Sequence, residues 1–351
     1  MGNNSSREMN RFDVVKGIGI ILMIVGHSKC PKSLYGIIYG FHMPLFFIVS
    51  GMLYDKEKWE KCGFVELMKK RAKSYLLPYF ALSGINLFLN AINELSKYPE
   101  VNDWLDSQIY HTGWIIYGSS VTGQNPNSTP LWFLPCLFIS CFILYFVEKL
   151  SWGGQIGIYL CLFGINRVIF YTIPEITPKT LPWHMEVALI GAVLMGIGYH
   201  IQKHEALNVI EKNRMVLLVV LMAGILGDCI NYRKVGLASN RVGNPLAFLI
   251  CSIAMTLTLL ILSHKILKTA VGQFLAFCGN STMIFMGFNY YFNTMSAKLW
   301  KKIPVLNNYK YTWWMKSIVV ISLLVLTSYL WKLMLRKYYK WRRGKEIIVV
   351  E

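Results

Sequence analysis

The chain has 351 residues, of which 54% are hydrophobic and only 15% are charged. A soluble globular domain carries about 25% charged residues, so this composition excludes an ordinary water-soluble enzyme. The apolar side chains come in blocks of roughly 17–23 residues, the length that a helix needs to cross the hydrocarbon core of a bilayer. The net charge of +18 therefore indicates loops near anionic lipid rather than a nucleic-acid-binding surface.

The hydrophobic blocks predict an all-α, polytopic integral membrane protein with about ten transmembrane helices. No internal repeat is visible, so residues 1–351 are expected to form a single membrane domain. The longest connection, residues 95–130, is rich in Asn, Ser, Gly and Pro and is predicted to be a surface loop. The predicted spans cover roughly residues 12–28, 34–54, 75–93, 131–147, 155–173, 185–201, 214–230, 245–262, 273–292 and 314–335.

The distribution of Lys and Arg predicts the orientation of these helices. If the N-terminus is cytoplasmic, the cytoplasmic segments hold 23 basic residues and the outer loops hold 11. The predicted connection between the second and third spans alone has seven basic residues, from Lys56 to Lys73. Both termini are therefore expected in the cytoplasm of a multi-pass plasma-membrane protein. The last outer loop fits this rule less well, because it contains Lys298, Lys301, Lys302 and Lys310.

No metal site, disulfide framework or bound cofactor is predicted. The eight cysteines are scattered and show no CxxC spacing. The histidines outside the first two spans occupy loops or span ends, without the spacing of zinc ligands. The chain also contains no Walker A loop, GxGxxG, GxSxG or HExxH motif.

The first predicted span contains ionisable side chains, which are costly in hydrocarbon. Asp13 and Lys16 are three residues apart and can pair on one helix face. Lys16 and His27 are eleven residues apart, so they share a face and lie roughly 16 Å apart along the axis. This pattern indicates a cavity or polar partners. In the alternative interpretation, Lys16 extends to lipid headgroups and His27 lies at the outer interface.

The second predicted span contains His42 two residues before Pro44. Proline disfavours helical backbone at the preceding residue and suits the first turn of a helix. One interpretation is that residues 32–43 re-enter the membrane irregularly and the regular helix begins at Pro44, which would bring His42 next to His27. The alternative is a proline-kinked helix. In a simple hairpin with the first span, His42 would then lie level with about Gly19.

Four short motifs are distributed along the chain. The first is a basic residue, ten intervening residues and a histidine, represented by Lys16 and His27. The other three are Phe41-His42-Met43-Pro44 with Ser50-Gly51, Leu131-Trp132-Phe133-Leu134, and Gly279-Asn280-Ser281. Together they resemble membrane acyltransferase family 3, which includes O-acetylases of the fucose 4-O-acetylase type. One departure is Asn289, where members of this subgroup often carry a histidine.

The resemblance implies an enzyme that transfers an acyl group, most often acetyl, from acyl-CoA to a hydroxyl of a cell-envelope carbohydrate or lipid-linked saccharide. Acetyl-CoA would be a co-substrate and the bilayer a further partner. A sugar hydroxyl is a poor nucleophile at neutral pH and needs a base, for which histidine is suited.

The resemblance also assigns roles to individual residues. His27 is the candidate base or, less favoured, the carrier of the acyl group, and His42 would stabilise the oxyanion or relay the proton. Lys16 would hold a phosphate or the thioester region of the donor, and Asp13 would orient Lys16. The substrate-binding side chains implied by the motifs are Arg11, Ser50, Trp132, Ser281 and Asn289.

The alternative function is a transporter or flippase of envelope glycans or lipid-linked sugars, which basic loops and intramembrane charges would serve equally well. The sequence shows no two-fold repeat and no paired interrupted helices in matching halves, which argues against it. A pure membrane anchor would leave Asp13, Lys16 and His42 unexplained.

Overall fold

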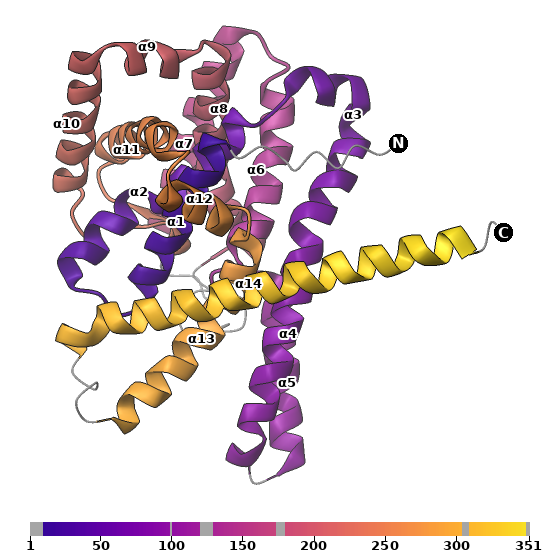
Figure 1. The fold of residues 1–351 in the computed structure, drawn as a ribbon. Coiled ribbons are helices and arrows are strands. Elements are labelled where there is room, and N and C mark those ends of the chain that lie inside the picture. The colour runs from indigo at the N-terminus through magenta and orange to yellow at the C-terminus, as the bar shows by residue number, and fades with distance from the viewer. Residues whose placement is uncertain (1–9, 99, 120–128, 173–179, 304–308, 349–351) are drawn as a thin grey trace.

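The computed structural model describes residues 10–98, 100–119, 129–172, 180–303 and 309–348. Within these ranges the chain is almost entirely helical, as predicted, with one two-stranded antiparallel ribbon of β1 (Val235–Gly236) and β2 (Arg241–Val242) (Figure 1). The α-helices are α1 (Arg11–His27), α2 (Lys32–Met52), α3 (Lys56–Arg71), α4 (Leu77–Glu94), α5 (Val101–Tyr117), α6 (Phe133–Val147), α7 (Trp152–Thr172), α8 (Met185–Lys203), α9 (Ala206–Lys212), α10 (Arg214–Ile230), α11 (Pro245–Ile266), α12 (Ala270–Gly279), α13 (Thr282–Lys302) and α14 (Tyr309–Ile348).

The predicted polytopic architecture is confirmed, but with fewer spans than the ten expected. Among the described residues, six helical segments are long and apolar enough to cross a membrane, or eight if two bent pairs each count as one span. The difference lies in α1, which has 17 residues and carries Arg11, Asp13 and Lys16, and in α6, which has 15 residues. Helices of this length reach only about 25 Å, less than the ~30 Å of a bilayer core.

Two helix pairs are bent, and one of the two bends interrupts a predicted span. α9 and α10 meet at 110°, and α12 and α13 meet at 80°. The second break falls at Asn280 and Ser281, between the two helices. The span predicted over residues 273–292 is therefore two helices that run in different directions.

Glycines allow several core helices to approach each other closely. A Cβ atom at Gly17 of α1 would lie 1.9 Å from the carbonyl oxygen of Leu275 in α12. A Cβ atom at Gly279 would lie 1.9 Å from the carbonyl oxygen of Asp13, and one at Gly198 of α8 would lie 2.0 Å from an α2 carbonyl oxygen. These helices therefore pack backbone against backbone, as is common where small residues line helix interfaces in membranes.

The surface loop predicted for residues 95–130 is wrong for part of that segment, which forms α5. This helix lies beside α4 (Figure 1), and the indole Nε1 of Trp104 donates a hydrogen bond to the carbonyl oxygen of Ala91 at 3.1 Å. The turn-forming residues of the segment lie mainly after Tyr117, and α5 itself contains a single Gly and no Pro. Residues 120–128 of the predicted loop lie outside the described part of the chain.

The irregular entry predicted for residues 32–43 is also wrong, because α2 is one uninterrupted helix with Pro44 inside it. Proline in a helix interior costs about 3 kcal/mol. Fourteen of the 21 residues of α2 are nevertheless buried, and the helix packs against α1, α8 and α11. This tertiary packing maintains the helix through the proline.

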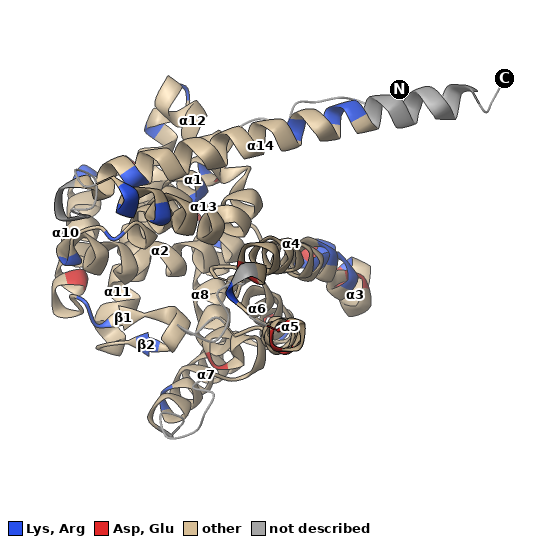
Figure 2. Ribbon diagram, turned by 90° about the horizontal axis from the view of Figure 1, so that it is seen from below, with Lys and Arg blue, Asp and Glu red and all other residues tan. Residues whose placement is uncertain are grey.

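The long helix α14 crosses the bundle and packs against α13 and α1 (Figures 1 and 2). Its segment Thr312–Tyr338 is a candidate span of which only 17% is buried within the molecule. One buried side chain of this helix, Lys316, lies on the part that faces the bundle. The contact between the last helix and the first brings this residue to the candidate site.

Candidate active site

A polar cavity of about 180 Å³ lies where the end of α1 meets the middle of α2. α1 contributes His27 to its wall, and α2 contributes Tyr39 and His42. Trp132, just before α6, and Arg241, in β2, also line it. Side chains from three distant parts of the sequence therefore converge on this space, hereafter the polar cavity.

The two histidines line one cavity because of the way α1 and α2 cross. The ring of Tyr39 packs against Gly26, the residue before His27, and the ring of Phe46 packs against Gly19. His42 lies about one helical turn from each of these two aromatic residues, so its level on α1 is about midway between Gly19, the level expected for a simple hairpin, and His27. The sequence could not predict this, since the register of two crossing helices depends on the packing of side chains from both.

The imidazole of His42 is buried and is oriented by a backbone hydrogen bond. Its Nδ1 lies 2.8 Å from the carbonyl oxygen of Ile38. Because a carbonyl oxygen can only accept a hydrogen bond, this contact assigns the proton to Nδ1. Nε2 of the neutral ring then keeps a lone pair and is able to accept a proton from a substrate.

His27 lies on the other side of Tyr39, whose ring centroid is 6.5 Å from that of His27 and 4.8 Å from that of His42. The cation that acts electrostatically on His27 is Lys316 of α14, which is only 2% exposed. In the sequence, Lys316 was only a basic residue near the start of the last span. Its relation to His27 depends on the packing of α14 against α1.

Lys16 and Asp13 form the ion pair that their spacing predicts, with 2.9 Å between Nζ and Oδ1. Asp13 is fully buried, whereas about a fifth of the Lys16 side chain is exposed. Lys16 is not among the described residues of the polar cavity wall. His27 and His42 line the polar cavity, whereas Lys16, predicted to share a helix face with His27, lies near the opposite end of α1.

Three other candidate residues lie away from the polar cavity. Arg11 pairs with Glu211 at 3.4 Å. The hydroxyl groups of Ser50 and Ser281 each donate to the carbonyl oxygen four residues earlier, at 2.7 and 2.8 Å. None of the three is among the described residues of the cavity wall, so the structure does not bring them together with the histidines.

A family model described as an acyltransferase domain matches residues 9–345 of the chain. The chain belongs to acyltransferase family 3. The match covers α1 to α13 and most of α14, and it includes every residue of the polar cavity named above. The protein is thus a multi-pass membrane acyltransferase. Comparisons with curated proteins and with solved structures gave no match.

Asn289, one of the candidate substrate-binding residues, belongs to a buried network on α13. The amide Nδ2 of Asn293 donates to Oδ1 of Asn289 at 2.8 Å, and the hydroxyl of Ser28 lies 3.4 Å from Oδ1 of Asn293. Nδ2 of Asn289 lies 3.5 Å from the sulfur of Met23, which lines the polar cavity. Asn289 therefore supports the cavity wall through Met23.

Replacement of Asn289 by Ala should destabilise this acyltransferase by about 0.5–1.5 kcal/mol, because it removes the hydrogen bond from Nδ2 of Asn293 to Oδ1 of Asn289 and leaves only the 3.2 Å bond to the carbonyl oxygen of residue 289. Thermal unfolding of the purified protein in detergent measures the effect. Asn93→Ala is the matched control, since Asn93 is exposed and bonds only within α4. Equal melting temperatures for the two variants would contradict a structural role for Asn289.

A second network positions the turn between β1 and β2. Nδ2 of Asn166 donates to Oδ1 of Asn240 at 2.8 Å and to the carbonyl oxygen of Glu186 at 2.5 Å. Nη2 of Arg167 donates to the carbonyl oxygen of Asn240 at 3.2 Å. Asn240 is the residue before Arg241, so this cluster holds the backbone that carries Arg241 into the cavity wall.

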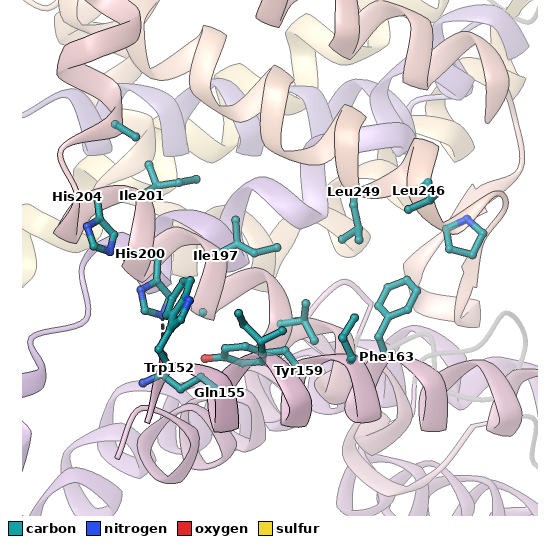
Figure 3. Close-up of a pocket in the computed structure, with 16 residues that line it drawn as sticks. Trp152, Gln155, Tyr159, Phe163, Ile197, His200, Ile201, His204, Leu246 and Leu249 are labelled. Atoms are coloured by element: carbon teal, nitrogen blue, oxygen red, sulfur yellow. Dashed lines mark hydrogen bonds between the residues drawn. The ribbon is translucent and has the colours of Figure 1, made fainter. Parts of the chain in front are cut away.

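A larger groove of about 610 Å³ lies between α7, α8 and α11 and differs in character (Figure 3). Its wall is mainly apolar and includes Phe163, Ile197 and Leu249. At one end, a ring nitrogen of His200 lies 3.0 Å from Oε1 of Gln155. All three helices belong to candidate spans, so the groove suits a hydrocarbon chain. The polar cavity is the better site for chemistry on a sugar hydroxyl.

Proposed function

We propose that this family 3 enzyme transfers an acetyl group from acetyl-CoA to a hydroxyl of a cell-envelope carbohydrate, free or lipid-linked, at the plasma membrane. The observation that carries the proposal is the convergence of His27 and His42 on one polar cavity, with Tyr39 between them. Aromatic walls with a few convergent polar groups are typical of small-molecule sites.

The proposed reaction begins when an imidazole removes the proton from the acceptor hydroxyl. Nε2 of His42 is suited to this step, because its Nδ1–H is held by Ile38. The hydroxyl oxygen attacks the thioester carbonyl, the C–S bond breaks, and the CoA thiolate leaves and takes up a proton. His27, the base favoured by the motif, faces the same space, so one imidazole acts as base while the other donates to the oxyanion.

We propose that the acyl-CoA donor binds near Lys16, toward the N-terminal end of α1. A cation near the N-terminal end of α1 suits a phosphate of CoA or its thioester region, and the buried Asp13 orients it through their 2.9 Å contact. The roughly 16 Å between Lys16 and His27 matches an extended donor that reaches from one end of α1 toward the other.

The deciding measurement is release of free CoA thiol by the purified protein in liposomes, given acetyl-CoA and isolated surface polysaccharide. We expect release only when the acceptor is present, with an acetyl-sized mass added to the polysaccharide. Movement of labelled glycan across the liposome membrane without thiol release would instead support the transporter alternative.

A further inference from the structure

Two segments with exposed cationic side chains adjoin residues of the polar cavity wall. The turn between α1 and α2 contributes two lysines, and the segment between α10 and α11 contributes three basic residues. All five are exposed, and neither segment contains an acidic residue. This cationic rim consists of Lys29, Lys32, Arg233, Lys234 and Arg241.

The two segments of the cationic rim contact each other and so form one surface. Nε of Arg233 donates to the carbonyl oxygen of Lys32 at 3.1 Å, and the Arg233 side chain packs against Gly36 in the second turn of α2. The guanidinium of Arg241 lies beside Gly236 of β1 and belongs to the cavity wall itself. The rim therefore continues from the surface into the polar cavity.

Charge is distributed unevenly over the loops predicted to face outward. The turn between α4 and α5 and the start of α5 carry Glu94, Glu100, Asp103 and Asp106 against one lysine, Lys97. In Figure 2, blue lies on β2 and just before β1, and red lies on α5. Cations on outward loops run against the charge rule that orients membrane helices, and the end of α13 carries Lys298, Lys301 and Lys302 as well. Among the basic residues of the described outward segments, Arg241 belongs to the cavity wall.

The small volume of the polar cavity favours an acceptor whose charged group binds outside it, at the cationic rim. The polar cavity, at about 180 Å³, is smaller than the ~300–1,000 Å³ of a typical ligand pocket. It therefore accommodates the reacting part of a glycan, while neighbouring groups remain outside. The planar guanidinium of Arg241 can bind a phosphate or a carboxylate through two parallel hydrogen bonds.

We propose that the acceptor is an anionic glycan, with a phosphodiester or carboxylate bound by Arg241 and the cationic rim while its hydroxyl reaches the cavity histidines. This inference rests on the proposed acyl transfer and specifies its substrate class. It also gives a role to Arg241, the one Lys or Arg among the described residues of the cavity wall.

Initial-rate kinetics in liposomes test the proposal with three acceptors: a glycerol phosphate oligomer, an oligogalacturonate and an uncharged glucan oligomer. We expect transfer to an anionic acceptor, and the comparison of the first two identifies the anion. Arg241→Gln should raise the KM for that acceptor roughly tenfold or more and leave the KM for acetyl-CoA unchanged. Arg241→Lys should retain part of the affinity, and Lys97→Gln should behave as wild type.

Two outcomes would overturn this inference while leaving acyl transfer intact. One is equal use of the uncharged glucan. The other is a rise in the KM for acetyl-CoA in Arg241→Gln, which would mean that the cation serves the donor. Absence of thiol release with all three acceptors and with isolated surface polysaccharide would instead contradict the proposed function. Size-exclusion profiles of each variant separate these kinetic effects from misfolding.

Discussion

Replacing either cavity histidine by alanine should reduce acyl transfer by about 10²–10⁴-fold, the range contributed by a positioned acid or base. The expectation follows from geometry, because His27 and His42 line one polar cavity and His42 has a single ring nitrogen left to accept a proton. The measurement is the rate of CoA thiol release in liposomes with a fixed amount of folded protein.

His264→Ala is the matched control for these variants. His264 lies on α11 at an exposed position, where its Nδ1 is 2.7 Å from Glu211, and it does not line the polar cavity. We expect this variant to retain full activity. Full transfer by His27→Ala would remove that residue as the base and assign the step to His42, and full transfer by both variants would exclude the polar cavity as the reaction site.

A side chain at Gly17 or Gly279 should prevent the native packing of α1 on α12. Even the Cβ of alanine would lie 1.9 Å from a backbone oxygen at either position, so the helices must separate. We expect Gly17→Ala and Gly279→Ala each to lower the free energy of unfolding by about 3 kcal/mol or more, at the upper end of overpacking costs. Activity should fall as well, because α1 carries His27.

Gly84→Ala separates this steric effect from the ordinary effect of removing a glycine. Gly84 is exposed on α4, and a Cβ there would have nothing within 4 Å. This variant should be neutral or more stable by about 0.5–1 kcal/mol, since alanine is the better helix former. Thermal unfolding in detergent compares the three proteins. A melting temperature of Gly17→Ala equal to that of Gly84→Ala would refute the close contact.

Much of the fold was predictable because apolar length and charge spacing are local properties. Each predicted span coincides with a helix or a bent helix pair. The pair of Asp13 and Lys16 also followed from spacing, since residues three apart share a helix face. α5 was missed because the Gly, Pro, Ser and Asn residues that follow Tyr117 dominated the composition of the whole segment 95–130, whereas α5 itself contains a single Gly and no Pro.

The candidate site was predictable in part. The motifs of family 3 pointed to His27, His42 and Trp132, and all three line the polar cavity. They gave no indication of Arg241 or Lys316, which come from segments far along the chain without a recognisable pattern. Arg241 reaches the cavity only because Asn166 and Arg167 hold the preceding residue.

The amino-acid sequence by itself determined that this chain is a helical membrane protein of acyltransferase family 3, because bilayer thickness sets the length of apolar segments and short motifs identify the family. Only the tertiary structure decided which polar groups share a space. Helix register and crossing depend on contacts between distant residues. These contacts placed His27 and His42 on one cavity with Tyr39 between them, left Lys16 with Asp13 near the other end of α1, and brought Arg241 into the cavity wall.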